Sequence, residues 1–183
     1  MKEAPGGHES GQDLAYRARA LAQAHPLTAT ARRYMDAFVV EETESQPMPE
    51  IAVWASIAFL NGYCVRRVEE ADAGVEEAAV PAFPASASTD RAAQHLEQLR
   101  PLVARAAADL RAGTADRFLL GPADRTIDAL ERIVASEVDR RLDHLRDEID
   151  DEAWPETADY LAWWVVTGYA MRAVEVAVPT AGR

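Results

Sequence analysis

The chain carries one segment twice, and this repeat constrains the fold more than any other feature. Residues 49–69 and 155–175 align without a gap at 8 of 21 positions, 106 residues apart. The identical positions are Pro49/Pro155, Glu50/Glu156, Ala52/Ala158, Gly62/Gly168, Tyr63/Tyr169, Arg66/Arg172, Val68/Val174 and Glu69/Glu175. Each copy of such a repeat is one structural unit, so the repeat bears on the whole architecture. We expect a duplicated unit with approximate two-fold symmetry.

Proline, glycine and capping residues divide the chain into helices. The expected helices cover residues 12–25, 27–44, 49–71, 89–112, 124–151 and 155–178. No segment alternates polar and apolar residues for long enough to predict a strand. The sequence therefore predicts an all-α fold, a six-helix bundle made of two fused three-helix repeats with pseudo-two-fold symmetry. The predicted organisation is one compact domain with a disordered tail at 1–11, a first repeat at 12–72, a linker at 73–88, a second repeat at 89–178 and a tail at 179–183.

Glycine lies in the middle of both copies of the repeated helix, at Gly62 and Gly168. A glycine inside a helix costs about 1 kcal/mol relative to alanine, so its presence in both copies suggests a close approach of two backbones. A neighbouring track of small residues supports this interpretation: Ala52, Ser56, Ala158 and Ala162. Both helices are apolar on nearly every side, which is typical of buried helices. We expect the two helices to cross near the glycines.

Each repeated helix then carries an arginine and a glutamate at the end of its buried stripe. These are Arg66 with Glu69 in the first copy and Arg172 with Glu175 in the second. An unpaired buried charge is expensive, so we expect ion pairs, either within a helix or reciprocally as Arg66–Glu175 and Arg172–Glu69. Such pairs would hold the core in register. The alternative is that both arginines flank a cavity on the two-fold axis and bind an anionic ligand.

Further candidate ligand-binding residues lie beside these charges. Tyr63 and Tyr169 are expected to hydrogen-bond within the core, and no activating neighbour for proton transfer is evident. Asn61 and Thr167 precede the glycines, where they would bond a ligand, each other or the backbone. Tryptophans gather in and next to the same helices, as core residues or as the lining of an aromatic pocket: Trp54, Trp154, Trp163 and Trp164.

Most familiar catalytic and metal-binding patterns are missing. The chain has no phosphate-loop or dinucleotide fingerprint, no Gly-x-Ser-x-Gly elbow, no EF-hand loop and no Glu-x-x-His. Acidic runs at 41–44 and 147–152 are expected to be solvated rather than to bind a cation, and His144 with Glu148 is a weak metal pattern. Cys64 is expected to be a small buried apolar residue. The catalytic residues are unknown, and we expect no metal and no cofactor.

The charge balance limits the partners. With 19 basic and 31 acidic residues, the net charge is −12, which disfavours nucleic acids and anionic membrane surfaces. No apolar run is long enough to span a bilayer, and residues 1–12 lack the apolar core of a signal peptide. We expect a cytoplasmic protein that is a monomer or a homodimer.

These observations favour a non-catalytic binding module. A partner protein or a small, possibly anionic, ligand would bind in a groove between the repeats. One alternative is a small helical enzyme, of the kind found in specialised metabolism, with Arg, Tyr and carboxylate groups in a site between the repeated helices. A second alternative is a structural dimerisation domain.

Overall fold

The computed structural model describes residues 10–39, 41, 50–75, 89–114, 118–145 and 154–177. All regular structure within these residues is helical. The elements are α1 (Gly11–Ala22), α2 (Ala29–Tyr34), η1 (Met35–Val39), α4 (Glu50–Asp72), α5 (Thr89–Arg111), α6 (Ala123–Leu145) and α7 (Trp154–Ala177). The all-α expectation is therefore confirmed for this part of the chain. The organisation into two duplicated units, the linker and the tails stay predictions.

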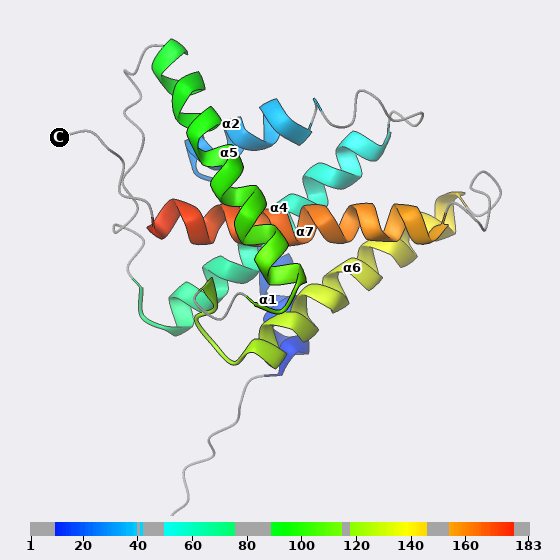
Figure 1. Ribbon diagram of the computed structural model, residues 1–183. Coiled ribbons are helices and arrows are strands. Elements are labelled where there is room, and N and C mark those ends of the chain that lie inside the picture. The colour runs from blue at the N-terminus through cyan, green and yellow to red at the C-terminus, as the bar shows by residue number, and fades with distance from the viewer. Residues whose placement is uncertain are drawn as a thin grey trace, which may run out of the picture.

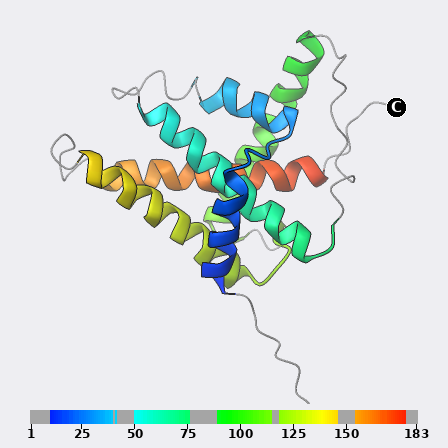
Figure 2. The same ribbon diagram turned by 180° about the vertical axis from the view of Figure 1, so that it is seen from behind.

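Helices α4 and α7 form the centre of the molecule. Figure 1 shows α5 lying across the front of α7, and Figure 2, from behind, shows α1 lying across α4. Helices α2 and α6 flank this stack on different sides. The two central helices are covered on several sides, as their apolar composition requires, because a helix without a polar face must be buried.

The two glycines lie where α4 and α7 cross. A Cβ atom on Gly62 would be 1.8 Å from the carbonyl oxygen of Val165, and one on Gly168 would be 1.9 Å from that of Phe59. Phe59 and Val165 are themselves 106 residues apart, so each helix places the same two positions at the crossing. The predicted crossing near Gly62 and Gly168 is thus confirmed.

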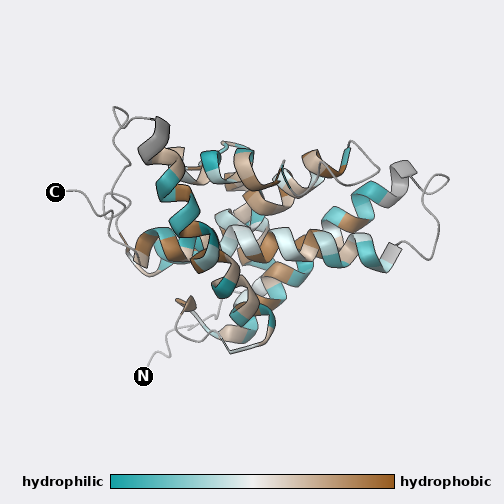
Figure 3. Ribbon diagram, turned by 45° about the horizontal axis from the view of Figure 1, so that its top comes forward, coloured by the Kyte–Doolittle hydropathy of each residue, from teal (hydrophilic) through white to brown (hydrophobic). Residues whose placement is uncertain are grey.

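Two outer helices begin at residues whose side chains cap them. Ser10 caps α1 and Thr28 caps α2, each accepting a hydrogen bond from a backbone N–H three residues on. The helix expected at 27–44 differs from the structure, because α2 ends at Tyr34 and the chain widens into the π-helix η1. Phe38 and Val39 of η1 lie in the core. The outer helix α5 alternates between hydrophilic and hydrophobic residues in Figure 3.

Candidate functional site

A buried polar cluster joins the C-terminal halves of α4 and α7. On one side, the Tyr63 hydroxyl of α4 donates to Glu175 Oε2 of α7 at 2.8 Å. Arg172 Nη1 donates to the same oxygen at 3.3 Å, and the hydroxyl of Thr28, the cap of α2, donates to Glu175 Oε1. Both oxygens of this carboxylate are therefore bonded inside the protein.

The other side repeats this arrangement with the helices exchanged. The Tyr169 hydroxyl of α7 donates to Glu69 Oε2 of α4 at 2.6 Å. Arg66 Nη1 lies 4.0 Å from Glu69 Oε2, and the Thr126 hydroxyl of α6 donates to Glu69 Oε1. Arg66 also donates to the backbone carbonyl of Phe118. Two tyrosine–glutamate–arginine–threonine groups thus face each other across the centre of the fold.

Glu70 joins the two groups. Arg66 Nε donates to Glu70 Oε1 at 3.3 Å, and Arg172 Nε donates to Glu70 Oε2 at 2.8 Å. The position equivalent to Glu70 in the second copy is Val176, so the cluster contains three carboxylates and two guanidinium groups. Its centre is therefore asymmetric although its two sides correspond.

The arginine–glutamate pairs of the repeat follow the first of the two alternatives, in which each pair forms within one helix. Arg66–Glu69 and Arg172–Glu175 form within each helix, and among the described pairs the reciprocal contacts are made by the tyrosines instead. Each guanidinium group also lies over a tyrosine ring of the other helix, Arg66 over Tyr169 and Arg172 over Tyr63. In both cases the guanidinium carbon is 5.7 Å from the ring centre. The two helices are joined by the tyrosine–glutamate hydrogen bonds and, directly, by the ion pair between Arg172 Nη2 of α7 and Glu70 Oε2 of α4 at 2.7 Å.

The environment sets the protonation of this cluster. Burial raises the pKa of Tyr63 and Tyr169 well above the usual value, and the neighbouring carboxylates raise it further. Burial alone lowers the pKa of Arg172, but its hydrogen bond with Glu70 and the nearby acidic groups raise it overall. Both tyrosines are therefore neutral hydrogen-bond donors, and Arg172 stays charged. These properties suit a structural ion network better than a proton-transfer site.

Asn61 and Thr167 bond to the backbone rather than to each other. Thr167 Oγ1 donates to the carbonyl oxygen of Trp163 at 2.7 Å, and Asn61 Nδ2 donates to that of Ile57 at 3.1 Å. Asn61 Nδ2 also lies 3.4 Å from Glu137 Oε1 of α6, a residue only 2 % exposed. Glu137 is a buried acid outside the repeated segments, and no sequence pattern marks it.

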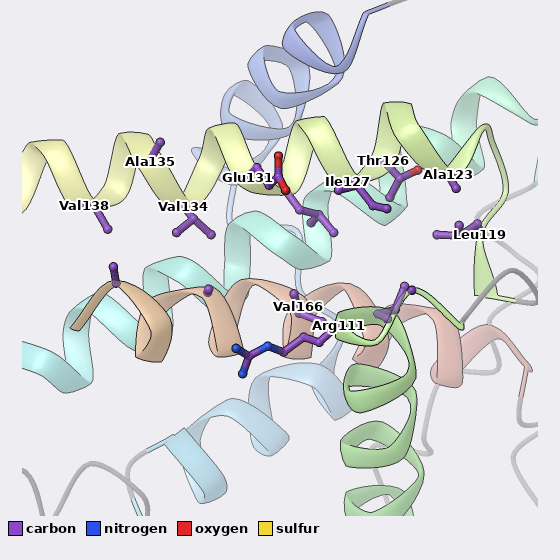
Figure 4. A pocket seen from close by; sticks show the side chains of 15 residues that line it. Arg111, Leu119, Ala123, Thr126, Ile127, Glu131, Val134, Ala135, Val138 and Val166 are labelled. Carbon is purple, nitrogen blue, oxygen red and sulfur yellow. The ribbon is translucent and has the colours of Figure 1, made fainter. Parts of the chain in front are cut away.

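An apolar groove of about 490 Å³ lies between α6, α7 and the C-terminal end of α5 (Figure 4). Its lining from α6 recurs every three or four residues, at Ile127, Leu130, Val134 and Val138. The small residues Ala158 and Ala162 of α7 line its other side. Their equivalents Ala52 and Ser56 of α4 line a smaller cavity of about 290 Å³ beside Leu27 and Met35. The predicted track of small residues therefore lines two cavities.

Polar groups of the groove are few. Arg111 extends from the end of α5 and pairs with Asp159 of α7, while Glu131 lies on α6. Thr126, which also lines the groove, bonds to Glu69 of the buried cluster. The groove thus lies next to the cluster but takes no charged atom from Arg66 or Arg172.

Two of the four tryptophans lie in the core, whereas most residues of the acidic runs lie outside the described residues. Trp54 and Trp164 are buried core residues, and Arg141 lies over the Trp54 ring at 5.5 Å. The side chains of Trp154 and His144 and the run at 147–152 lie outside the described residues, as does the run at 42–44. Among the side chains that the structure describes, no group of three or more His, Cys, Asp or Glu is placed to hold a metal ion.

Some residues of the cluster and the groove have no strong sequence signal. Glu70 has no acidic counterpart in the repeat, and Thr28 lies outside the repeated segments. The α6 side of the groove does have a signal, since apolar residues at helical spacing are visible between 127 and 138.

Comparison with known proteins adds nothing further, because no protein-family model, curated protein or solved structure matches this chain. None of the described helices combines the length and the hydropathy needed to cross a membrane.

Proposed function

We propose that the protein is a non-catalytic binding module, and that a small, mainly apolar molecule binds in the groove between α5, α6 and α7. The observation that carries this proposal is the groove itself. Its volume of about 490 Å³ falls in the range of small-molecule sites, roughly 300–1,000 Å³, which are mostly apolar with a few polar groups.

The buried cluster supports a binding role better than a catalytic one. Its carboxylates bond to tyrosine, threonine and arginine within the protein, and Arg66, Arg172, Glu69, Glu70 and Glu175 are all buried. We propose that Arg66, Arg172, Tyr63 and Tyr169 support the groove as its rigid framework. The same reciprocal contacts favour the proposal that the chain consists of two duplicated three-helix units, related by a pseudo-two-fold axis through the crossing.

The repeat supplies a matched pair of variants for the test. Ala158 lines the groove, and Ala52 occupies the same position of the repeat in the smaller cavity. We expect the neutral fluorescent probe N-phenyl-1-naphthylamine to bind the native protein saturably at one site. Ala158→Phe fills the groove and should weaken this binding at least tenfold, whereas Ala52→Phe should leave it unchanged. Fluorescence titration measures both, and circular dichroism checks that the variants fold.

Two results would contradict the proposal. The first is an absence of saturable binding to the native protein. The second is an equal loss of binding in both variants, which would indicate that the probe reports general loosening of the core rather than occupation of the groove.

A further inference from the structure

A second cavity, of about 480 Å³, lies between α1 and α6 and differs in character from the apolar groove. Its lining includes three arginines, Arg19 of α1 with Arg132 and Arg140 of α6, and one acid, Asp139. Asp128 pairs with Arg132 at 2.9 Å from one helical turn away. A net positive group of side chains around a cavity is notable in a chain whose net charge is −12.

Arg19 lies between these charges, and its guanidinium group has an N–H donor without a partner among the described residues. Its Nη2 donates to the backbone carbonyl of Arg132 at 3.0 Å, which fixes the side chain across the gap between the two helices. Its Nε is shielded from solvent and has no hydrogen-bond partner among the described residues. Burial lowers the pKa of Arg19, and the positive charge of Arg140 lowers it further, although the charge of Glu137 partly opposes both effects. An anion in the cavity would relieve that repulsion and accept hydrogen bonds from the guanidinium groups.

An aromatic ring borders the same cavity. Tyr16, one turn of α1 before Arg19, is 74 % exposed, the most exposed of the large apolar residues that the structure describes. Exposed aromatic rings beside basic side chains provide a surface on which a planar ring can stack. The cavity therefore combines contacts for an oxyanion with a contact for a flat ring.

We propose that the cavity between α1 and α6 binds a small phosphorylated molecule with a planar ring, of the mononucleotide class. Arg19 and Arg140 contact the phosphate, and Tyr16 stacks against the ring. This site shares only Ala135 of α6 with the apolar groove, and the proposal does not depend on the function proposed above.

Isothermal titration calorimetry of the full chain with AMP, adenosine and inorganic phosphate tests the proposal. We expect AMP to bind saturably at one site, at least tenfold more tightly than either adenosine or phosphate. Arg140→Gln should weaken AMP binding at least tenfold. Tyr16→Ala should weaken AMP binding but leave the phosphate affinity unchanged. Arg140 and Tyr16 are exposed, so both variants should keep the native circular dichroism spectrum.

Arg105→Gln is the matched control, because Arg105 is an exposed arginine on α5 and does not line the cavity. It removes the same charge and should leave AMP binding unchanged. Equal weakening in Arg105→Gln and Arg140→Gln would show attraction by overall charge and would overturn the site. Absence of AMP binding would overturn it as well. Phosphate binding as tight as AMP binding, unaffected by Tyr16→Ala, would overturn the proposed role of the ring.

Discussion

The hydroxyls of Tyr63 and Tyr169 each join α4 to α7 by donating to a buried glutamate on the other helix. A carboxylate held away from water needs several donors, and each glutamate of these pairs receives one from tyrosine and one from threonine. Removing one donor leaves a charged oxygen with fewer partners, which costs more than the loss of an exposed hydrogen bond.

Tyr63→Phe and Tyr169→Phe should therefore each lower the free energy of unfolding, by about 1–3 kcal/mol. Because the two sites correspond, we expect the two losses to be similar. Urea denaturation followed by circular dichroism measures them. Tyr16→Phe removes an exposed hydroxyl and serves as the control, with an expected change below about 0.5 kcal/mol. A loss of that small size in both core variants would show that the hydroxyls do not stabilise the fold.

At the scale of helices, the crossing of α4 and α7 depends on the absence of two side chains. An alanine at Gly62 or Gly168 would gain about 1 kcal/mol in helix propensity. Its Cβ, however, would overlap a backbone carbonyl oxygen of the other helix, which cannot move aside as a flexible side chain can. The steric effect therefore outweighs the gain in propensity.

Gly62→Ala and Gly168→Ala should each destabilise the protein by about 3 kcal/mol, the upper end of the usual cost of overpacking, since both force the central helices apart. Thermal unfolding followed by circular dichroism measures this effect. Gly121→Ala is the control, because the nearest atom to its added Cβ is Arg125 Nη1 at 3.8 Å. Near-native unfolding temperatures for both helix variants would contradict the crossing.

Asp72, at the C-terminal end of α4, joins three helices. Arg17 of α1 donates to its Oδ1 at 2.6 Å, and Arg125 of α6 donates to its Oδ2 at 2.9 Å. Burial alone raises the pKa of Asp72, but the hydrogen bonds and charges of the two arginines outweigh it and hold the pKa below the usual value. The ionised carboxylate is thus favoured in the folded state.

Asp72→Asn should cost about 1 kcal/mol at pH 7, since the acid is partly exposed and its pairs are screened by solvent. The contribution of a lowered pKa is present above the unfolded value, about 3.9, and is lost as pH falls through the lower folded value. The difference between native protein and variant should accordingly shrink below about pH 4. Urea denaturation at pH 7, 5 and 3 tests this, with Asp159→Asn at the exposed Arg111 pair as control. A difference that is constant across these pH values would rule out the charge as its source.

Some of these features could be predicted from the sequence and others could not, for physical reasons. The helix crossing was predictable because glycine has few other reasons to recur inside two apolar helices. The role of Glu70 was not, because it has Val176 as its counterpart and its partners come from both helices. The sequence predicted a groove between the repeats, whereas the groove of about 490 Å³ lies within the predicted second repeat. Its position depends on where the end of α5 lies against α6 and α7, a tertiary relation that helical periodicity does not contain. The change from α-helix to π-helix at Met35 likewise leaves no periodic pattern in the sequence.

For the whole molecule, the central pair unites the parts of the chain on either side of residues 76–88. Each of α4 and α7 buries its apolar surface against the other, so a fragment with only one of them would expose that surface. Glycines, tyrosines and charged residues from both parts also contact one another at and next to the crossing. The two predicted repeats should therefore depend on each other for folding.

Fragments 1–75 and 89–183, expressed separately, should each lack a cooperative unfolding transition. An equimolar mixture should recover native-like circular dichroism and a single transition, because the missing helix is supplied in trans. The intact chain is the reference for both measurements. Cooperative unfolding of either fragment alone would show that its half is an independent domain.

The reactivity of Cys64 can report how often the core of the protein opens to solvent. The thiol is fully buried in α4, two residues from the crossing glycine, and burial raises its pKa to about 12. A protonated, inaccessible thiol does not react with Ellman's reagent, so labelling requires exposure of the core. The labelling rate of the unaltered protein should fall to a small fraction of that in 6 M guanidinium chloride, and the ratio of the two rates gives the free energy of opening. Fast labelling under native conditions would mean that the crossing opens easily. Because Cys64 is the chain's single cysteine, every variant described above can be compared on this scale without attaching a dye or adding a mutation.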